Sequence, residues 1–298
     1  MTGAPLEAGL RPRRSALYMP ASKARALDKA RALAADVLLF DLEDAVAPGE
    51  KAAARDLLVA ALAEGGYAPR ETVIRVNGPN TPWGVADIVA AATAGADAVL
   101  LPKVEGAAAI EAAAAALDAA GGPPGLALWA MIETPRGVLA AGEIAAHPRL
   151  ACLVAGTNDL LAELQARFSP DRAALMPALT QVVLAARAHG KAVLDGVYNA
   201  YGDDAGLEIE ARQGRMLGMD GKTLIHPRQL AIANRLFAPD AEAVDRARAE
   251  VEAFEAATAR GEGIAVLDGR IVENLHAAAA RRLIAQAEAI AALEAATA

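Results

Sequence analysis

The sequence has few aromatic residues, a single cysteine and no long uncharged apolar run. Phe, Trp and Tyr together make up only 3% of the 298 residues. The lone cysteine, Cys152, excludes an internal disulfide, and its place in an apolar run predicts a small core residue rather than a nucleophile. No segment of membrane-spanning length is free of Pro, Gly or polar residues, and residues 1–14 lack the apolar region of a signal peptide. We therefore expect a soluble, cytoplasmic protein.

Basic charge is also scarce. The chain has 29 Lys and Arg residues against 37 Asp and Glu residues, which gives a net charge of −8. No stripe of basic residues interleaved with aromatics is present, so the sequence argues against a nucleic-acid partner. With 55% hydrophobic and 22% charged residues, the chain is not intrinsically disordered. Its length allows one large α/β barrel or two modest domains.

Short apolar runs alternate with alanine-rich helical stretches about eight times. Runs such as 37–40 and 98–101 are apolar throughout, as is typical of parallel strands covered on both faces. Stretches such as 22–35 and 49–64 are long enough to be the helices that connect parallel strands. The expected strands are 15–20, 37–43, 72–77, 98–103, 126–133, 150–156, 191–197 and 221–226. Eight such units predict a (β/α)8 TIM barrel over residues 1–238.

The remaining residues, 239–298, form more than a short tail. We expect a helix over 239–260, a hairpin over 264–272 around the turn pair Asp268-Gly269, and a final helix over 275–298. An appendage of this size is interpreted as a C-terminal lid, an oligomerisation arm, or both.

Polar residues follow nearly every expected strand. Barrel enzymes place their chemistry at the C-terminal ends of the strands, and the strand starts show no comparable series, so these residues are interpreted as one active site. They are Asp41, Glu43, Asp44, Arg75, Asn77, Lys103, Glu133, Asn158, Asp159, Asp195 and His226.

Glu133 and Asp159 stand out in this series. Each follows an apolar run and precedes a helix start, and they are about one strand-helix unit apart, so we expect them on adjacent parallel strands. A magnesium ion, which takes one or two carboxylates from a protein and keeps most of its waters, fits such a pair. We therefore predict that Glu133 and Asp159 hold Mg²⁺.

Several short motifs, in order along the chain, resemble the citrate lyase β-subunit-like branch of the HpcH/HpaI aldolase/citrate lyase family. The motifs are Arg14-Ser15-Ala16-Leu17, Asp41-Leu42-Glu43-Asp44, Arg75-Val76-Asn77, Leu101-Pro102-Lys103, Ile132-Glu133-Thr134-Pro135, Gly156-Thr157-Asn158-Asp159, and Gly221-Lys222 before Ile225-His226-Pro227. Each one alone is weak, but the set covers nearly the whole chain.

The resemblance implies a magnesium-dependent carbon-carbon lyase or the reverse synthase. Its substrate would be a β-hydroxyacyl-CoA such as malyl-CoA, citramalyl-CoA or citryl-CoA, and its products an acyl-CoA and a 2-oxo acid. Two alternatives stay open: a class II pyruvate aldolase that acts on a 4-hydroxy-2-oxo acid without CoA, and a subunit that acts only with an acyl carrier protein. A homo-oligomer, trimer or hexamer, is implied by resemblance alone.

The resemblance also implies roles for individual residues. Glu133 and Asp159 would ligate the metal, with Glu133 and Asn158 also contacting the substrate. Arg75 would capture a substrate carboxylate with its planar fork and stabilise the thioester enolate. Glu273, where relatives carry an aspartate, would be the general acid/base, with a carboxyl that reaches one methylene further.

The remaining assignments surround this centre. Tyr18, Lys23 and Lys29 would hold CoA, the two lysines through its phosphates. A second set would support the metal, its waters and the substrate arginine by hydrogen bonds and charge. That set comprises Asp41, Glu43, Asp44, Lys103 and Asp195.

Overall fold

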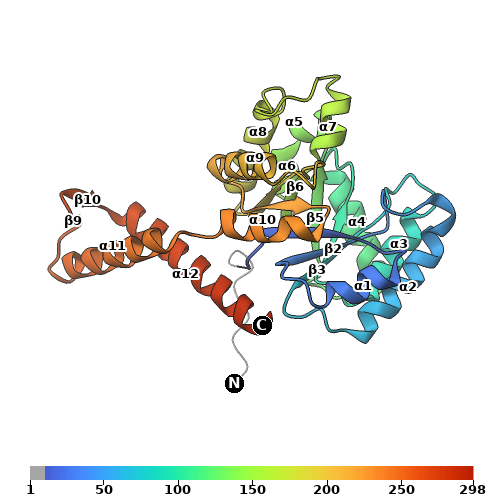
Figure 1. The fold of residues 1–298 in the computed structure, drawn as a ribbon, viewed down its shortest axis with the longest axis horizontal. Coiled ribbons are helices and arrows are strands. Elements are labelled where there is room, and N and C mark those ends of the chain that lie inside the picture. Colours follow the sequence, from blue (N-terminus) through green and yellow to red (C-terminus); the bar gives the residue numbers. More distant parts are fainter. Residues whose placement is uncertain (1–10, 298) are drawn as a thin grey trace. The chain divides into compact units, whose positions relative to one another are not determined.

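The protein, described here over residues 11–297 by a computed structural model, divides into two compact units (Figure 1). Arg13–Phe237 form one unit, and the chain from Ala238 onward belongs to the other. In the larger unit, eight parallel strands close into a barrel in chain order, which confirms the predicted (β/α)8 fold. The strands are β1 (Ser15–Pro20), β2 (Val37–Asp41), β3 (Glu71–Arg75), β4 (Ala98–Leu101), β5 (Ala127–Ile132), β6 (Leu150–Ala155), β7 (Ala192–Asp195) and β8 (Gly221–Leu224).

Helices connect successive strands and cover the outside of the barrel. Two of them differ from the expected bounds: the first is shorter than 22–35, and the second follows a turn of 3-10 helix over Pro48–Glu50. The helices are α1 (Ala24–Ala30), α2 (Lys51–Glu64), α3 (Gly84–Thr93), α4 (Ala107–Ala119), α5 (Pro135–Leu139), α6 (Ala141–Ala145), α7 (Thr157–Glu163), α8 (Met176–Ala188), α9 (Asp204–Leu217) and α10 (Leu230–Phe237).

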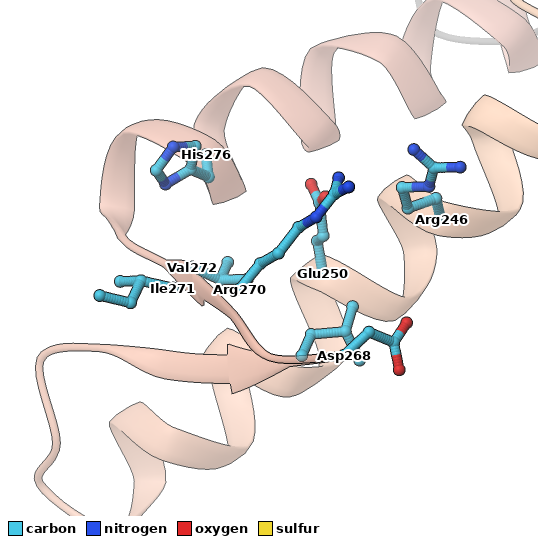
Figure 2. Close-up of a pocket in the computed structure, with 8 residues that line it drawn as sticks. Arg246, Glu250, Asp268, Arg270, Ile271, Val272 and His276 are labelled. Carbon is cyan, nitrogen blue, oxygen red and sulfur yellow. The ribbon is translucent and has the colours of Figure 1, made fainter.

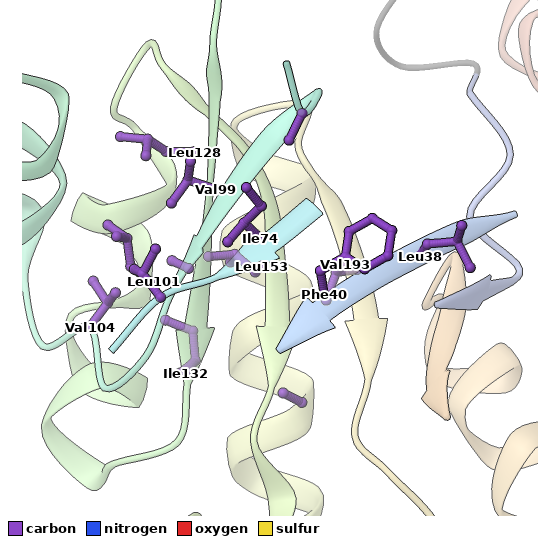
Figure 3. Packing of buried hydrophobic residues seen from close by; sticks show 14 of the residues in the cluster. Leu38, Phe40, Ile74, Val99, Leu101, Val104, Leu128, Ile132, Leu153 and Val193 are labelled. Atoms are coloured by element: carbon purple, nitrogen blue, oxygen red, sulfur yellow. The ribbon is translucent and has the colours of Figure 1, made fainter. Parts of the chain in front are cut away.

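The strands bury side chains on both faces, which is why their sequences do not alternate. The outward-facing set packs against the helices and forms the main core (Figure 3). The inward-facing set fills the barrel and includes Cys152, which is buried and unpaired as predicted. That inner set consists of Ala16, Val37, Leu39, Val73, Ala98, Leu100, Trp129, Met131, Cys152, Val154 and Leu194.

The N-terminal end of the barrel carries buried charges, so the expectation of no polar series at the strand starts is wrong. Arg13 donates two hydrogen bonds to Glu71, at 2.6 and 2.8 Å, and its guanidinium lies 5.2 Å from the ring centroid of Trp129. Arg14 forms a second bidentate pair with Asp36 at 2.9 Å. Arg13 and Arg14 directly precede β1, while Asp36 precedes β2 and Glu71 begins β3, so the two pairs tie the start of β1 to the starts of β2 and β3.

The C-terminal unit has the expected helix, hairpin and helix. Helix α11 (Ala241–Ala259) and helix α12 (Asn274–Thr297) pack along each other, and β9 (Ala265–Leu267) pairs antiparallel with β10 (Arg270–Val272). The hairpin turns at Asp268 and Gly269, which both have positive φ, at 49° and 75°. Among residues 11–297, no helix combines the length and the apolar character needed to cross a membrane.

Candidate metal and substrate site

Glu133 and Asp159 meet at the C-terminal mouth of the barrel. Glu133 directly follows β5, and Asp159 lies in the first turn of α7, after the neighbouring strand β6. Glu133 is 4% exposed and accepts a hydrogen bond of 2.7 Å from the backbone N–H of Lys103. The carboxyl group of Asp159 lies within hydrogen-bonding reach of Glu133. The two carboxyl groups therefore face one opening, which the metal hypothesis requires.

The local sequence creates the space that Glu133 occupies. Gly156, at the end of β6, lacks the Cβ atom that would lie 2.7 Å from Oε2 of Glu133. On the other side, Thr134 caps α5 by accepting a hydrogen bond of 3.0 Å from the N–H of Gly137. Pro135 begins that helix without needing a hydrogen-bonded N–H. A strand end, a cap and a glycine together direct Glu133 into the mouth.

The charge on Glu133 is poorly compensated. Burial raises the pKa of Glu133 to about 8; the hydrogen bond from the Lys103 N–H opposes this rise, while the nearby charges of Glu43 and Asp159 add to it. The ammonium of Lys103 lies 3.5 Å from Asp159, so it neutralises Asp159 rather than Glu133 directly. A divalent cation between the two carboxylates would relieve this unfavourable charge.

The two carboxylates suit magnesium better than an ion whose ligands all come from the protein. Within residues 11–297, no group of three or more His, Cys, Asp or Glu side chains is arranged to hold a metal. Two carboxylates with an otherwise open coordination sphere suit Mg²⁺, which dehydrates reluctantly and shares its sphere with water and substrate oxygens. Glu133 and Asp159 would supply such a pair.

Arg75, at the end of β3, is held by the acid that ends β2 and by two acids that follow it. Asp41 accepts two hydrogen bonds from it, at 2.7 and 2.6 Å, while Glu43 and Asp44 lie 3.0 and 3.2 Å from its Nη1 atom. The guanidinium also lies 4.7 Å from the ring centroid of Tyr18. Arg75 is therefore fixed in orientation before any substrate binds.

The loop that carries Glu43 is anchored by Lys51, a residue for which no role was predicted. The Lys51 ammonium donates hydrogen bonds to the carbonyl oxygens of Leu42 and Glu43, at 3.1 and 2.9 Å, and to Asn77 at 2.7 Å. A signal was present, because Lys51 lies on the buried stripe of α2 with Ala54 and Leu58. Burial raises the pKa of Glu43 to about 7, although the charge of Arg75 opposes the rise.

The residues expected to bind CoA come from β1 and α1. Tyr18 faces the barrel mouth beside Arg75, whereas Lys23 and Lys29 are exposed at the start and in the last turn of α1. Asn158 is exposed and exchanges amide hydrogen bonds with Asn199, at 2.8 and 3.2 Å.

Asp195 differs most from its expected place. It is fully buried on the helix-facing side of β7, where it pairs with Arg172 at 2.7 Å and Lys222 at 3.2 Å. His226, grouped with the active-site series in the sequence, caps the following 3-10 turn, since its ring accepts a hydrogen bond from the backbone N–H of Arg228.

Glu273, the expected acid/base, is an exposed residue of the C-terminal unit between β10 and α12. Its backbone N–H donates a hydrogen bond of 3.1 Å to the ring of His276. A pocket of about 460 Å³ lies nearby in the same unit, and His276 lines it (Figure 2). The other lining residues are Arg246, Glu250, Leu267, Asp268, Arg270, Ile271 and Val272.

Comparison with known proteins finds relatives that match most of the chain. A model of the HpcH/HpaI aldolase/citrate lyase family matches residues 14–227. The chain is 55% identical to a (3S)-malyl-CoA thioesterase of Cereibacter sphaeroides, over 95% of this chain and 98% of that one. It is 39% identical to the citrate lyase subunit beta of Escherichia coli, over 93% and 94% of the two chains.

A solved structure gives the same fold. The protein CitE of Mycobacterium tuberculosis, crystallised in complex with magnesium, acetoacetate and coenzyme A, superposes with a TM-score of 0.74. The match has 30% identity and covers 95% of this chain and 100% of that one.

Proposed function

The chain belongs to the HpcH/HpaI aldolase/citrate lyase family, and from this membership we propose that it is a magnesium-dependent enzyme that hydrolyses the thioester of malyl-CoA or a closely related β-hydroxyacyl-CoA. The observation that carries the proposal is the buried carboxylate of Glu133, which lies beside that of Asp159 and within residues 11–297 forms no ion pair with a basic side chain. The 55% identity to malyl-CoA thioesterases over nearly the full length of both chains supports the choice of substrate.

Glu133 and Asp159 would hold the Mg²⁺ ion. The ion would supply Lewis-acid polarisation of the carboxylate and hydroxyl oxygens at the malyl end of the substrate. Lys103 would remain beside Asp159 and limit the negative charge of the pair. Lys23 and Lys29 would bind the phosphates of CoA, as predicted from the sequence.

Glu43 is suited to accept a proton from the attacking water. Burial brings its pKa to about 7, so an appreciable fraction is ionised at neutral pH. Its carboxylate lies 3.0 Å from Nη1 of Arg75, which fixes its direction. The water oxygen would bond to the thioester carbon, and the carbon-sulfur bond would break to release CoA as the thiolate and malate as the acid.

Carbon-carbon cleavage, the outcome predicted from the sequence, is the second candidate. The 39% identity to a citrate lyase β subunit favours it. In that reaction Glu273 would take the proton of the substrate hydroxyl, the carbon-carbon bond would break, and its electron pair would pass into the thioester enolate beside Arg75. Malyl-CoA would then give glyoxylate and, after protonation of the enolate, acetyl-CoA.

One assay separates the two reactions. The full chain is incubated with malyl-CoA and Mg²⁺, free thiol is followed with a chromogenic disulfide, and glyoxylate is followed as its phenylhydrazone. We expect thiol and malate in equal amounts without glyoxylate. Glyoxylate with acetyl-CoA would establish the lyase instead. Turnover of a 4-hydroxy-2-oxo acid in place of CoA thioesters would instead identify an aldolase. Activity only in the presence of an acyl carrier protein would identify a carrier-dependent subunit.

Magnesium affinity should depend on pH through Glu133. Its carboxylate binds the ion only when ionised, and burial raises its pKa from 4.5 to about 8, so protons compete with Mg²⁺ at neutral pH. The apparent Kd for Mg²⁺ should fall by up to about tenfold per pH unit as the pH rises towards 8, and then level off. Calorimetric titration of the wild type and Glu133→Gln at several pH values measures this. A wild-type affinity that is constant with pH would contradict the assignment.

The raised pKa of Glu133 acts in the opposite direction on the stability of the metal-free protein, which should decrease as the pH rises. Because the folded state binds the Glu133 proton more tightly than the unfolded state, this residue stabilises the fold fully below about pH 4.5, and that stabilisation is lost as the pH rises through about 8. Added Mg²⁺ should counteract this loss, since it binds the folded protein alone.

A further inference from the structure

The hydroxyl group of Tyr18 is buried in the barrel mouth without a hydrogen-bond partner. Within residues 11–297, its oxygen is one of five buried side-chain polar atoms that no protein group pairs. A buried hydroxyl without a partner destabilises a protein relative to one that is paired. Such a group is unusual in a folded protein, and at a site for ligands it indicates a bond that a ligand completes.

The surroundings of Tyr18 are those of the candidate site. Tyr18 lies in β1 opposite Leu39 of β2, two residues before Asp41 on that strand, and faces inward. The guanidinium of Arg75 covers its ring at 4.7 Å from the centroid. The carboxylates whose charges act on the phenol are Asp41, at the end of β2, together with Glu43 and Glu133, which follow β2 and β5.

The phenol is a donor and not an acid at this position. Burial raises the pKa of Tyr18 well above its ordinary range, and the acids nearby add to the rise, while the charge of Arg75 opposes it. The O–H group therefore stays protonated across the neutral range. Its one available role is to donate a hydrogen bond to an oxygen that enters the mouth.

We propose that Tyr18 donates this hydrogen bond to the thioester carbonyl oxygen of the bound acyl-CoA, an inference that rests on the proposed function. The malyl carboxylate and hydroxyl are assigned to the side of Glu133 and Asp159, and the thioester enolate to Arg75. Because Arg75 lies against the ring of Tyr18, an oxygen held beside Arg75 would be placed to accept a second hydrogen bond from the Tyr18 hydroxyl. That oxygen gains negative charge when water adds to the carbonyl carbon in hydrolysis, and also when carbon-carbon cleavage leaves the enolate. In both cases the electron pair moves onto the oxygen and Tyr18 keeps its proton.

The variant Tyr18→Phe tests the proposal because it keeps the ring against Arg75 and removes only the hydroxyl. The expected kcat with malyl-CoA is about 10²-fold lower, the usual effect of losing one donor to a developing oxyanion, while KM changes little. The melting temperature of the ligand-free protein should be unchanged or higher, since an unpaired polar group has been removed. The matched control is Tyr67→Phe, which removes a hydroxyl that donates to the carbonyl oxygen of Leu27 outside the site and should keep full activity.

A binding measurement separates this role from a structural one. Two unreactive CoA analogues are compared, a ketone that keeps the carbonyl oxygen and a thioether that lacks it. Tyr18→Phe should weaken binding of the ketone several-fold and leave binding of the thioether unchanged. Equal effects on the two analogues would overturn the proposal. A kcat of Tyr18→Phe equal to that of the wild type would also overturn it. If the wild type turns over no CoA thioester, the proposed function itself fails and the assignment of Tyr18 fails with it.

Discussion

Glu133→Gln is expected to lower kcat/KM for the CoA thioester by at least about 10³-fold, which corresponds to about 4 kcal/mol of transition-state stabilisation. The substitution keeps the shape of the side chain and the oxygen that accepts the Lys103 N–H, but it removes the charge that would bind Mg²⁺. Its new amide N–H group can donate to Asp159, the carboxylate within its reach. The loss should therefore come from the metal and not from the fold.

The melting temperature of Glu133→Gln distinguishes a loss of metal binding from a loss of folding. Because burial disfavours the ionised carboxylate of Glu133, the metal-free variant should unfold at the same temperature as the wild type or above it at pH 8. Added Mg²⁺ should raise the melting temperature of the wild type but not of Glu133→Gln. Glu111→Gln is the control, since Glu111 is exposed on α4 and pairs with His147 away from the mouth. Full activity of Glu133→Gln with limiting Mg²⁺ would refute the metal assignment.

Much of the fold could be predicted because the strands leave a clear pattern in the sequence. Each expected strand coincides with an observed one, with ends that differ by a few residues at most, as at 37–43 against Val37–Asp41. The proximity of Glu133 and Asp159 could also be predicted, since residues at the same end of adjacent parallel strands must lie at one edge of the barrel. Helix α1 was less predictable because no side-chain cap marks its start.

The direction in which a strand-end residue points could not be predicted. In strands buried on both faces, polar and apolar positions do not alternate, so nothing in the sequence tells the inward face from the outward one. Asp41 and Asp195 both end apolar strands, yet Asp41 holds Arg75 in the mouth and Asp195 faces the helices. The bidentate pair of Arg13 with Glu71 was missed for a related reason, because its partners are 58 residues apart.

Lys222 is the centre of the buried charge cluster that Asp195 joins. It is fully buried in β8 and donates hydrogen bonds to Asp195 at 3.2 Å, to Glu210 of α9 at 2.6 Å, and to the carbonyl oxygen of Gly196. Arg172 is the second cation of the cluster, so two positive charges balance two negative ones. Burial alone would raise the pKa of Asp195, but Lys222 and Arg172 hold it below its ordinary value.

Lys222→Met should therefore lower the free energy of unfolding by about 3–5 kcal/mol, because it leaves a carboxylate buried without its cation. Urea denaturation at neutral pH measures this loss. The double variant Lys222→Met/Glu210→Met removes one charge of each sign and should recover much of it. Lys191→Met, a change at a half-buried lysine next to β7, should unfold like the wild type. A loss below about 1 kcal/mol in Lys222→Met would show that the cluster is not what stabilises this side of the barrel.

The same variant should also weaken the site, through Gly196. A Cβ atom on Gly196 would lie 2.3 Å from Oγ1 of Thr157, so the end of β7 packs directly against the start of α7, which carries Asp159. Lys222 fixes Gly196 through its carbonyl oxygen, and without that bond the start of α7 loses a rigid support. We expect the Mg²⁺ concentration for half-maximal activity to rise about 10-fold, well below the unfolding temperature, with a smaller change in kcat at saturating Mg²⁺. An unchanged Mg²⁺ requirement in folded Lys222→Met would mean that Asp159 is positioned by α7 alone, independently of the charges behind β7 and β8.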